Sequence, residues 1–132
     1  MKAEFTEALV FAARAHQNQQ YGDRPYIFHP MRVAELVMPE YRVVAVLHDC
    51  LEDAGRLPFW LSYPEKLAVH LLTREKKQPY AEYIDRIALA TGWPGECARA
   101  VKLADIADHL SHSPIPSQET RYRKAMKQLQ VV

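Results

Sequence analysis

The chain has 132 residues, a length typical of one domain with one buried core, and we predict a single domain over residues 1–132. Hydrophobic residues make up 48% of it and charged residues 25%, as in soluble globular proteins. The formal net charge of +1 argues against nucleic acid or an anionic membrane as a partner. The first residues lack the apolar core of a signal peptide, and no apolar run reaches the length of a membrane span, so we expect a cytoplasmic protein.

Hydrophobic residues recur with helical periodicity along most of the chain. The pattern predicts helices over residues 5–19, 31–38, 40–53, 65–73, 80–90, 96–110 and 118–129. Pro30 suits the first turn of the second helix, Arg32 should face outward from it, and Gly55 suits the C-terminal cap of the third. The polar run over residues 17–25, with its Gly and Pro, predicts a loop. Since no segment alternates as a strand would, we predict an all-α fold, a compact bundle of about six to seven helices.

One predicted helix carries a cluster of acids. An apolar stretch, residues 44–47, leads into His48 and Asp49, and Glu52 and Asp53 follow one helical turn later. Residues three or four positions apart share a helix face, so one imidazole and three carboxylates would project together. Unpaired acids are costly to bury, and a bound cation is the simplest reason to gather them.

Other helices would have to complete such a site, because a catalytic divalent ion usually takes three or four protein ligands. His29 stands where an aromatic segment enters a helix, and Asp105 is an acid in a helix rich in Ala, Val and Leu. Each signal also has a structural interpretation, as a hydrogen-bonded core residue or, for Glu52 and Asp53, as a solvated helix end. The conjunction of all four signals favours a metal site.

The order His, His-Asp, Glu-Asp and Asp resembles the HD-domain superfamily of metal-dependent phosphohydrolases. Within it, the chain is similar to the hydrolase domain of RelA/SpoT proteins and to small stand-alone alarmone hydrolases. The similarity runs from the first helix to about residue 110. It is carried by Ala13-Arg14-Ala15-His16 with Gln19, Pro25-Tyr26-Ile27-Phe28-His29-Pro30, Val33-Ala34, Ala45-Val46-Leu47-His48-Asp49-Cys50-Leu51-Glu52-Asp53, Leu72-Thr73 and Val101-Lys102-Leu103-Ala104-Asp105.

The resemblance implies an HD-type helical bundle and a set of residue roles. One divalent ion, typically Mn²⁺, would be bound by His29, His48, Asp49 and Asp105. Glu52 and Asp53 would position or activate the attacking water. The implied reaction is hydrolysis of a phosphoester or pyrophosphate, in the similar proteins the removal of the 3′-pyrophosphate of guanosine tetra- or pentaphosphate.

The chain departs from the family pattern at residues expected to recognise the substrate. The loop after His16 has Tyr21 and Arg24 where the family has a basic pair, so Arg24 would substitute for that pair and Tyr21 would stack on a base. His109 replaces the usual Asn, and either contacts substrate or is hydrogen-bonded to a neighbour such as Asp105. Lys102 is either a phosphate contact or a lysine at the rim of the cleft. His16 either lines the site or packs against the loop that carries His29.

Two other functions remain open. One is a different HD nucleotide phosphohydrolase, and the other is a non-catalytic nucleotide-binding regulatory module. In each case the expected partner is a small-molecule nucleotide, with neither nucleic acid nor a membrane. The sequence leaves the oligomeric state open, a homo-oligomer included.

Overall fold

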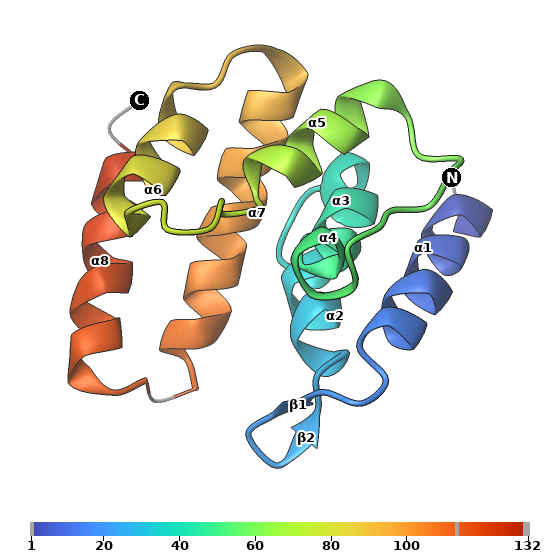
Figure 1. The fold of residues 1–132 in the computed structure, drawn as a ribbon, viewed down its shortest axis with the longest axis horizontal. Helices are drawn as coiled ribbons and strands as arrows, with labels where there is room; N and C mark the ends of the chain where they lie inside the picture. The colour runs from blue at the N-terminus through green and yellow to red at the C-terminus, as the bar shows by residue number, and fades with distance from the viewer. Residues whose placement is uncertain (1, 113, 131–132) are drawn as a thin grey trace.

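The computed structural model describes residues 2–112 and 114–130, and their regular structure is almost entirely helical (Figure 1). If α3 and α4 are counted as one interrupted helix, the described residues contain seven α-helices, and the predicted all-α bundle is confirmed. A 3₁₀ helix, η1, precedes α3, and two short strands separate α1 from α2. The elements are α1 (Lys2–Ala15), β1 (Gln20–Tyr21), β2 (Arg24–Pro25), α2 (Phe28–Glu35), η1 (Pro39–Tyr41), α3 (Arg42–Leu47), α4 (Cys50–Ala54), α5 (Tyr63–Leu71), α6 (Tyr80–Leu89), α7 (Gly92–Leu110) and α8 (Pro116–Gln130).

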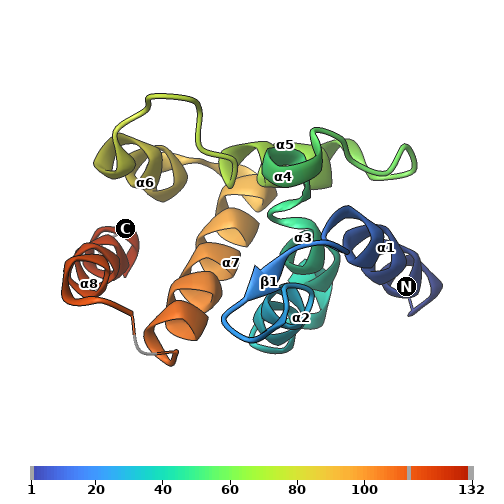
Figure 2. The same cartoon turned by 60° about the horizontal axis from the view of Figure 1, so that its bottom comes forward.

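Helix α7 runs through the middle of the molecule and packs against helices from both halves of the chain (Figure 2). Helices α2, α3 and α5 contact it from the N-terminal half, and α6 and α8 from the C-terminal half. Helix α1 lies farther out, against α3 and α4. The segments that carry the predicted metal ligands, on α2, between α3 and α4, and on α7, are therefore neighbours in space.

The apolar faces of these helices meet in one core. Its largest fully buried side chains include Leu47 of α3, Ile84 and Ile87 of α6, and Val101 and Ile106 of α7. Burial of such side chains is the main favourable term in folding, so α7 joins the two halves by contributing to the core on both of its sides. Among the described residues, no helix combines the length and the apolar character that crossing a membrane requires.

The predicted helix over residues 40–53 is interrupted at its functional motif. His48 and Asp49 form a turn between α3 and α4, and the amide of His48 donates to the carbonyl of Ala45, three residues back, as in a 3₁₀ turn. Helix α4 then ends at Gly55, whose φ of 73° lies in the left-handed region that glycine adopts without strain. The predicted C-cap is confirmed.

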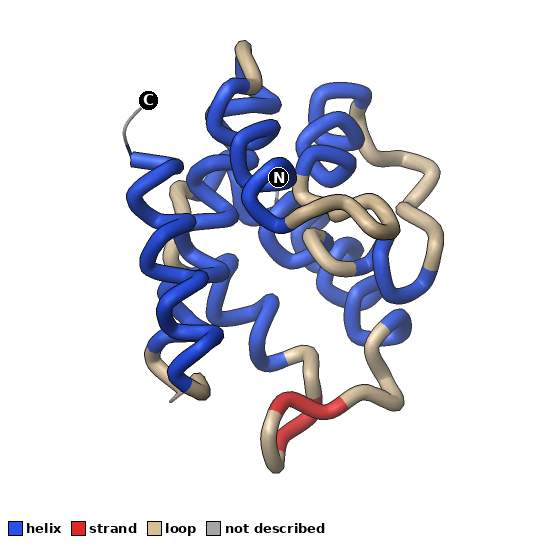
Figure 3. Tube along the Cα trace, turned by 60° about the vertical axis from the view of Figure 1, so that its left-hand side comes forward, coloured by secondary structure: helices blue, strands red, loops and turns tan. Residues whose placement is uncertain are grey.

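The segment predicted as a loop contains a small hairpin, visible as the red strands in Figure 3. Gln20 pairs with Pro25 and Tyr21 with Arg24 in antiparallel register. Gly22, with a φ of 65°, supplies the left-handed turn residue between the strands. Two residues per strand are too few to show an alternating pattern in the sequence, which is why only a loop was predicted.

Candidate metal centre

The four predicted metal ligands come together beside α7. They lie in the first turn of α2 (His29), in the interruption between α3 and α4 (His48 and Asp49), and in the C-terminal half of α7 (Asp105). One donor atom from each side chain lies within 4.8 Å of the other three. Both histidines and Asp105 are buried, and Asp49 is partly exposed. The cluster could hold a metal ion, and it offers that ion an open side.

The distances between donor atoms match one coordination shell. Ligand bonds of about 2.1 Å place adjacent atoms of an octahedral site about 3.0 Å apart and opposite atoms about 4.2 Å apart. Asp105 Oδ1 lies 2.9 Å from His29 Nε2 and 3.3 Å from His48 Nε2. Asp49 Oδ2 lies 3.1 Å from His48 Nε2 and 4.0 Å from His29 Nε2. Three of these separations suit adjacent ligands and the fourth suits opposite ones.

The ring of His48 is oriented from behind by the main chain. Its Nδ1 donates to the carbonyl oxygen of Ala45 at 2.6 Å, and a carbonyl only accepts hydrogen bonds. The proton of a neutral ring must therefore sit on Nδ1, which leaves the Nε2 lone pair facing Asp49 and Asp105. This tautomer is the one that binds metal ions.

The ring of His29 is oriented in the same way by a carboxylate. His29 Nδ1 donates to Asp108 Oδ2 at 2.6 Å, one helical turn beyond Asp105 on α7. Arg32, one turn beyond His29 on α2, donates from Nε and from Nη2 to the two oxygens of Asp108. The prediction that Arg32 faces outward is wrong, because a bidentate ion pair across two helices draws its guanidinium toward α7.

Two Nε2 lone pairs and two carboxylate oxygens thus point at one position. Like partial charges at these separations repel one another unless a proton or a metal ion lies between them. A divalent cation neutralises both carboxylates and uses both lone pairs. The residues present therefore fit a divalent ion.

The other two ligands also have partners. The hydroxyl of Tyr26 donates to Asp49 Oδ2, and burial, together with that carboxylate, raises the pKa of Tyr26 far above its usual value, so it remains a donor. His16 packs against the Tyr26 ring at 4.7 Å between centroids and hydrogen-bonds Gln19 through Nδ1. His16 is buried and supports Tyr26, so it acts on the cluster through Asp49.

Asp105 divides its two oxygens between different partners. Oδ1 faces the histidines, whereas Oδ2 accepts from the ammonium of Lys102 at 2.9 Å. His109 Nε2 also lies 3.3 Å from Oδ1. Lys102 is buried and faces the same cleft, as predicted, and its closest charged partner there is the ligand Asp105.

The charged groups of the cluster shift one another's pKa values. Burial alone would lower the pKa of His48, but Asp49 and Asp105 raise it well above its usual value. Burial alone would raise the pKa of Asp105, but Lys102 and the surrounding histidines hold it well below its usual range. The histidine and the carboxylates thus favour each other's charged forms.

A cleft of about 230 Å³ opens over the cluster, with Asp49 and Asp105 on its floor. Glu52 lies in its wall, and burial, followed by the charges of Asp49 and Asp53, raises the pKa of the Glu52 carboxyl. A raised pKa makes a carboxylate a better proton acceptor. The position and the basicity of Glu52 suit a group that takes a proton from water.

The structure separates Asp53 from its neighbour Glu52. Asp53 Oδ2 accepts from Gln19 Nε2 at 3.2 Å and lies 3.5 Å from His16 Nδ1. These contacts place Asp53 beside the short segment that joins α1 to β1. Of the two predicted water-handling residues, Glu52 is the one that lines the cleft.

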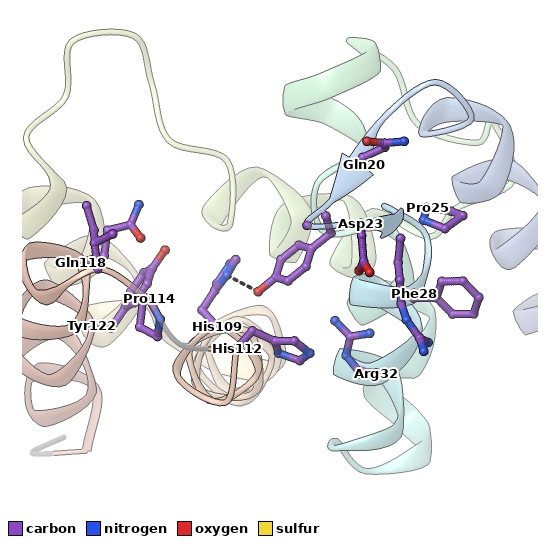
Figure 4. A pocket seen from close by; sticks show the side chains of 14 residues that line it. Gln20, Asp23, Pro25, Phe28, Arg32, His109, His112, Pro114, Gln118 and Tyr122 are labelled. Carbon is purple, nitrogen blue, oxygen red and sulfur yellow. Dashed lines mark hydrogen bonds between the residues drawn. The ribbon is translucent and has the colours of Figure 1, made fainter.

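A second, larger pocket of about 840 Å³ lies between the hairpin, α2 and the facing ends of α7 and α8 (Figure 4). Tyr21 forms part of its wall, stacks on His29 with ring centroids 5.0 Å apart, and shares a hydrogen bond of 2.9 Å with His109 Nδ1. His109 in turn stacks on Tyr122 of α8, and both rings border both cavities. Tyr21 and His109 are therefore adjacent to the metal cluster.

Arg24 lies farther from the cluster than the other predicted substrate contacts. Its guanidinium stands over the Phe28 ring, 5.7 Å from the centroid, on the rim of the larger pocket. Both residues are exposed. The structure thus brings Tyr21, His109 and Lys102 to the cluster and leaves Arg24 on the outer rim.

Two supporting residues were not identified from the sequence. Asp108 is buried and binds His29, and Tyr26 binds Asp49. Asp108 had a usable signal, because it stands three positions after Asp105 in an apolar helix and so shares its face. Tyr26 belongs to the aromatic segment before His29, and nothing in that segment indicates that its hydroxyl would bind Asp49.

Comparison with known protein families finds no family model that matches the chain. A search of curated proteins likewise finds no significant match.

Proposed function

We propose that this protein is a metal-dependent phosphohydrolase of the HD superfamily that acts on a nucleotide, with Mn²⁺ as its ion. The nearest specific activity is that of a guanosine-3′,5′-bis(diphosphate) 3′-pyrophosphohydrolase. The observation that carries the proposal is the convergence of His29, His48, Asp49 and Asp105 from separate helices on one position. Their order along the chain is the one that the HD resemblance assigns to metal ligands.

The surroundings of the cluster support hydrolysis over simple metal storage. A storage site needs only ligands, whereas here a cleft gives a second molecule access to the partly exposed Asp49. The cleft also holds a basic carboxylate, Glu52, and the cation Lys102. A divalent ion bound at this cluster would polarise a phosphoryl oxygen and lower the pKa of a water molecule.

The residues of the chain have defined tasks in the proposed reaction. Glu52 accepts a proton from the attacking water as the new oxygen–phosphorus bond forms. The old ester or anhydride bond breaks, the departing oxygen leaves with its electron pair and takes a proton from the solvent, and Glu52 returns to the solvent the proton that it accepted. Asp108 and the Ala45 carbonyl hold the two imidazoles in their ligand tautomer throughout.

The proposal is tested by a screen of nucleotide hydrolysis with Mn²⁺, in which Glu52→Gln is the paired control. We expect the variant to keep its metal and to lose about 10²- to 10⁴-fold in kcat, the usual contribution of a general base. Release of pyrophosphate from ppGpp supports the specific activity, and release of phosphate or triphosphate from simple nucleotides supports a different HD hydrolase. Tight nucleotide binding without turnover would instead indicate a regulatory module.

A further inference from the structure

Tyr80, the first residue of α6, lines the same cleft as the ligands Asp49 and Asp105. Three cationic side chains surround its ring. The guanidinium of Arg121 on α8 lies 4.4 Å from the ring centroid, that of Arg74 in the loop after α5 lies 5.7 Å away, and the ammonium of Lys102 lies 5.8 Å away. All four side chains line the cleft. Positive charge is therefore gathered around Tyr80 from three separate elements.

Only one of the three cations is matched by an acid. Lys102 is paired with Asp105. Arg74 uses its Nε to bind the carbonyl of Gln78 at 2.7 Å, and within residues 2–112 and 114–130 neither Arg74 nor Arg121 has a carboxylate at ion-pairing distance. Two exposed guanidinium groups thus line the cleft without a carboxylate at ion-pairing distance among the described residues.

Tyr80 also carries a hydroxyl group that has no partner within the described part of the chain. This hydroxyl is buried, yet it forms no hydrogen bond with any described residue. Buried polar atoms in proteins are nearly always paired, so an unpaired hydroxyl in the wall of a cleft points to a ligand atom as its partner. A hydroxyl donates well to a phosphate oxygen.

We propose that Arg74, Arg121 and the Tyr80 hydroxyl form a second phosphate subsite, which makes the protein selective for substrates with two linked phosphoryl groups over phosphomonoesters. The inference rests on the proposed function for its setting, but the subsite consists of other residues. A divalent ion at the cluster has its charge offset by Asp49 and Asp105, so additional phosphate charge must be met by other cations. Guanidinium groups suit this task, because their planar donors match two phosphate oxygens at once.

The competing interpretation is that these arginines are surface cations that stack on Tyr80 and Tyr122 and hold α8 in place. The two interpretations predict different effects of the arginine variants on pyrophosphate binding. A subsite binds pyrophosphate and loses that affinity when one guanidinium is removed. A stacking role affects only the stability of the protein.

The test is a calorimetric titration of the metal-free full chain with inorganic pyrophosphate and, separately, with inorganic phosphate. We expect Arg121→Gln and Arg74→Gln each to weaken pyrophosphate binding about tenfold or more, the value of a charge-assisted hydrogen bond, and to change phosphate binding much less. Tyr80→Phe should weaken pyrophosphate binding less than either. Arg123→Gln is the matched control, because Arg123 is an exposed arginine of α8 like Arg121 but does not line the cleft and is paired with Glu119 at 3.0 Å.

Pyrophosphate binding that is unchanged in both arginine variants, equally reduced in Arg123→Gln, or absent from the wild-type chain would overturn the subsite. Thermal melting of each variant shows whether a loss of binding is a loss of fold. Because this titration uses no metal and no turnover, its result is separate from the hydrolysis screen. If the chain binds pyrophosphate through the arginines but hydrolyses no nucleotide, the subsite is supported and the proposed function is refuted. If it hydrolyses a nucleotide but the arginine variants bind pyrophosphate normally, the proposed function is supported and the subsite is refuted.

Discussion

His29 and Asp108 are 79 positions apart in the sequence, yet their side chains form a hydrogen bond of 2.6 Å between Nδ1 and Oδ2. This bond fixes the face that His29 presents to the other three ligands. Arg32 binds both oxygens of the same carboxylate, so Asp108 of α7 is held by two side chains of α2. The affinity of the site for a metal ion should therefore depend on Asp108 and Arg32 as well as on the four ligands.

Asp108→Asn should weaken Mn²⁺ binding about 10- to 100-fold, as is usual when the carboxylate behind a ligating histidine is removed. The amide can no longer stabilise positive charge on the ring, and it loses the ion pair with Arg32. Asp85→Asn is the control, because this exposed carboxylate on α6 contacts only Gln128 among the described residues. A calorimetric titration with Mn²⁺ measures both variants, and equal affinities for Asp108→Asn and wild type would contradict the supporting role.

His48→Ala should reduce bound Mn²⁺ to a small fraction of the wild-type content and abolish any metal-dependent hydrolysis. The variant removes one of two nitrogen ligands at the centre of the cluster and leaves Asp49 and Asp105 without their shared partner. His70→Ala is the matched control, since His70 is exposed on α5, away from the cluster. Metal analysis after dialysis measures the bound Mn²⁺ in each variant. Full occupancy in His48→Ala would refute the assigned ligand set.

Metal affinity should fall as the pH is lowered. In the metal-free protein Asp49 and Asp105 raise the pKa of His48 well above its usual value, so the ring is protonated at any pH below that raised pKa. A metal ion binds only the neutral ring, and binding must therefore release about one proton per ion. Affinity should drop about tenfold for each pH unit below that pKa. Calorimetry in two buffers of different ionisation enthalpy counts the protons, and a release of none would rule out His48 as a protonated ligand.

The same groups set how the stability of the metal-free protein depends on pH. The raised pKa of His48 contributes stability that is fully present below the unfolded-state pKa of about 6.5 and is lost as the pH rises through the folded-state value. The lowered pKa of Asp105 contributes stability that is present above about 3.9 and is lost as the pH falls through its folded-state value. The free energy of unfolding, measured with denaturant, should therefore be greatest between about pH 3.9 and about pH 6.5. His48→Ala should remove the loss of stability on the alkaline side.

Gly95→Ala should destabilise the fold by about 1–3 kcal/mol, the range for overpacking a filled site. Gly95 is buried in the first turn of α7, and an added Cβ would overlap the carbonyl group of Ala90 at the end of α6. Backbone atoms cannot move aside as a flexible side chain can. Glu96→Ala, at the exposed neighbouring position, should be nearly neutral, and equal denaturation midpoints for the two variants would show that the α6–α7 junction can relax.

The sequence was most informative where a charged or polar residue stands in an apolar stretch, because burying it without a partner costs free energy. His48, Asp49 and Asp105 interrupt apolar helical stretches, and charged groups in such positions need partners wherever the helices pack. Their identification as a cluster with His29 therefore did not depend on knowing the topology. The helices were found for a similar reason, since apolar periodicity reflects the face that each must bury.

Local patterns failed where neighbours in sequence diverge in space. Glu52 and Asp53 look equivalent, but the turn of α4 sends one into the cleft and the other toward Gln19. Arg32 has the spacing of an exposed residue, but Asp108 draws it inward. Long polar side chains reach several ångströms beyond their own helix face, so their partners are set by the neighbouring helix.

The sequence by itself determined the all-α architecture, because apolar residues recur along each helix with helical periodicity, and the four candidate ligands followed from the order of their motifs, which resembles that of HD-domain proteins. Only the tertiary structure decided the rest of the site. The packing of α8 against α6 and α7 turns Arg121 toward Tyr80, and the packing of α2 against α7 joins His29 to Asp108. These contacts join residues that are distant in the chain, and their geometry exists only once the core has fixed the helices relative to one another.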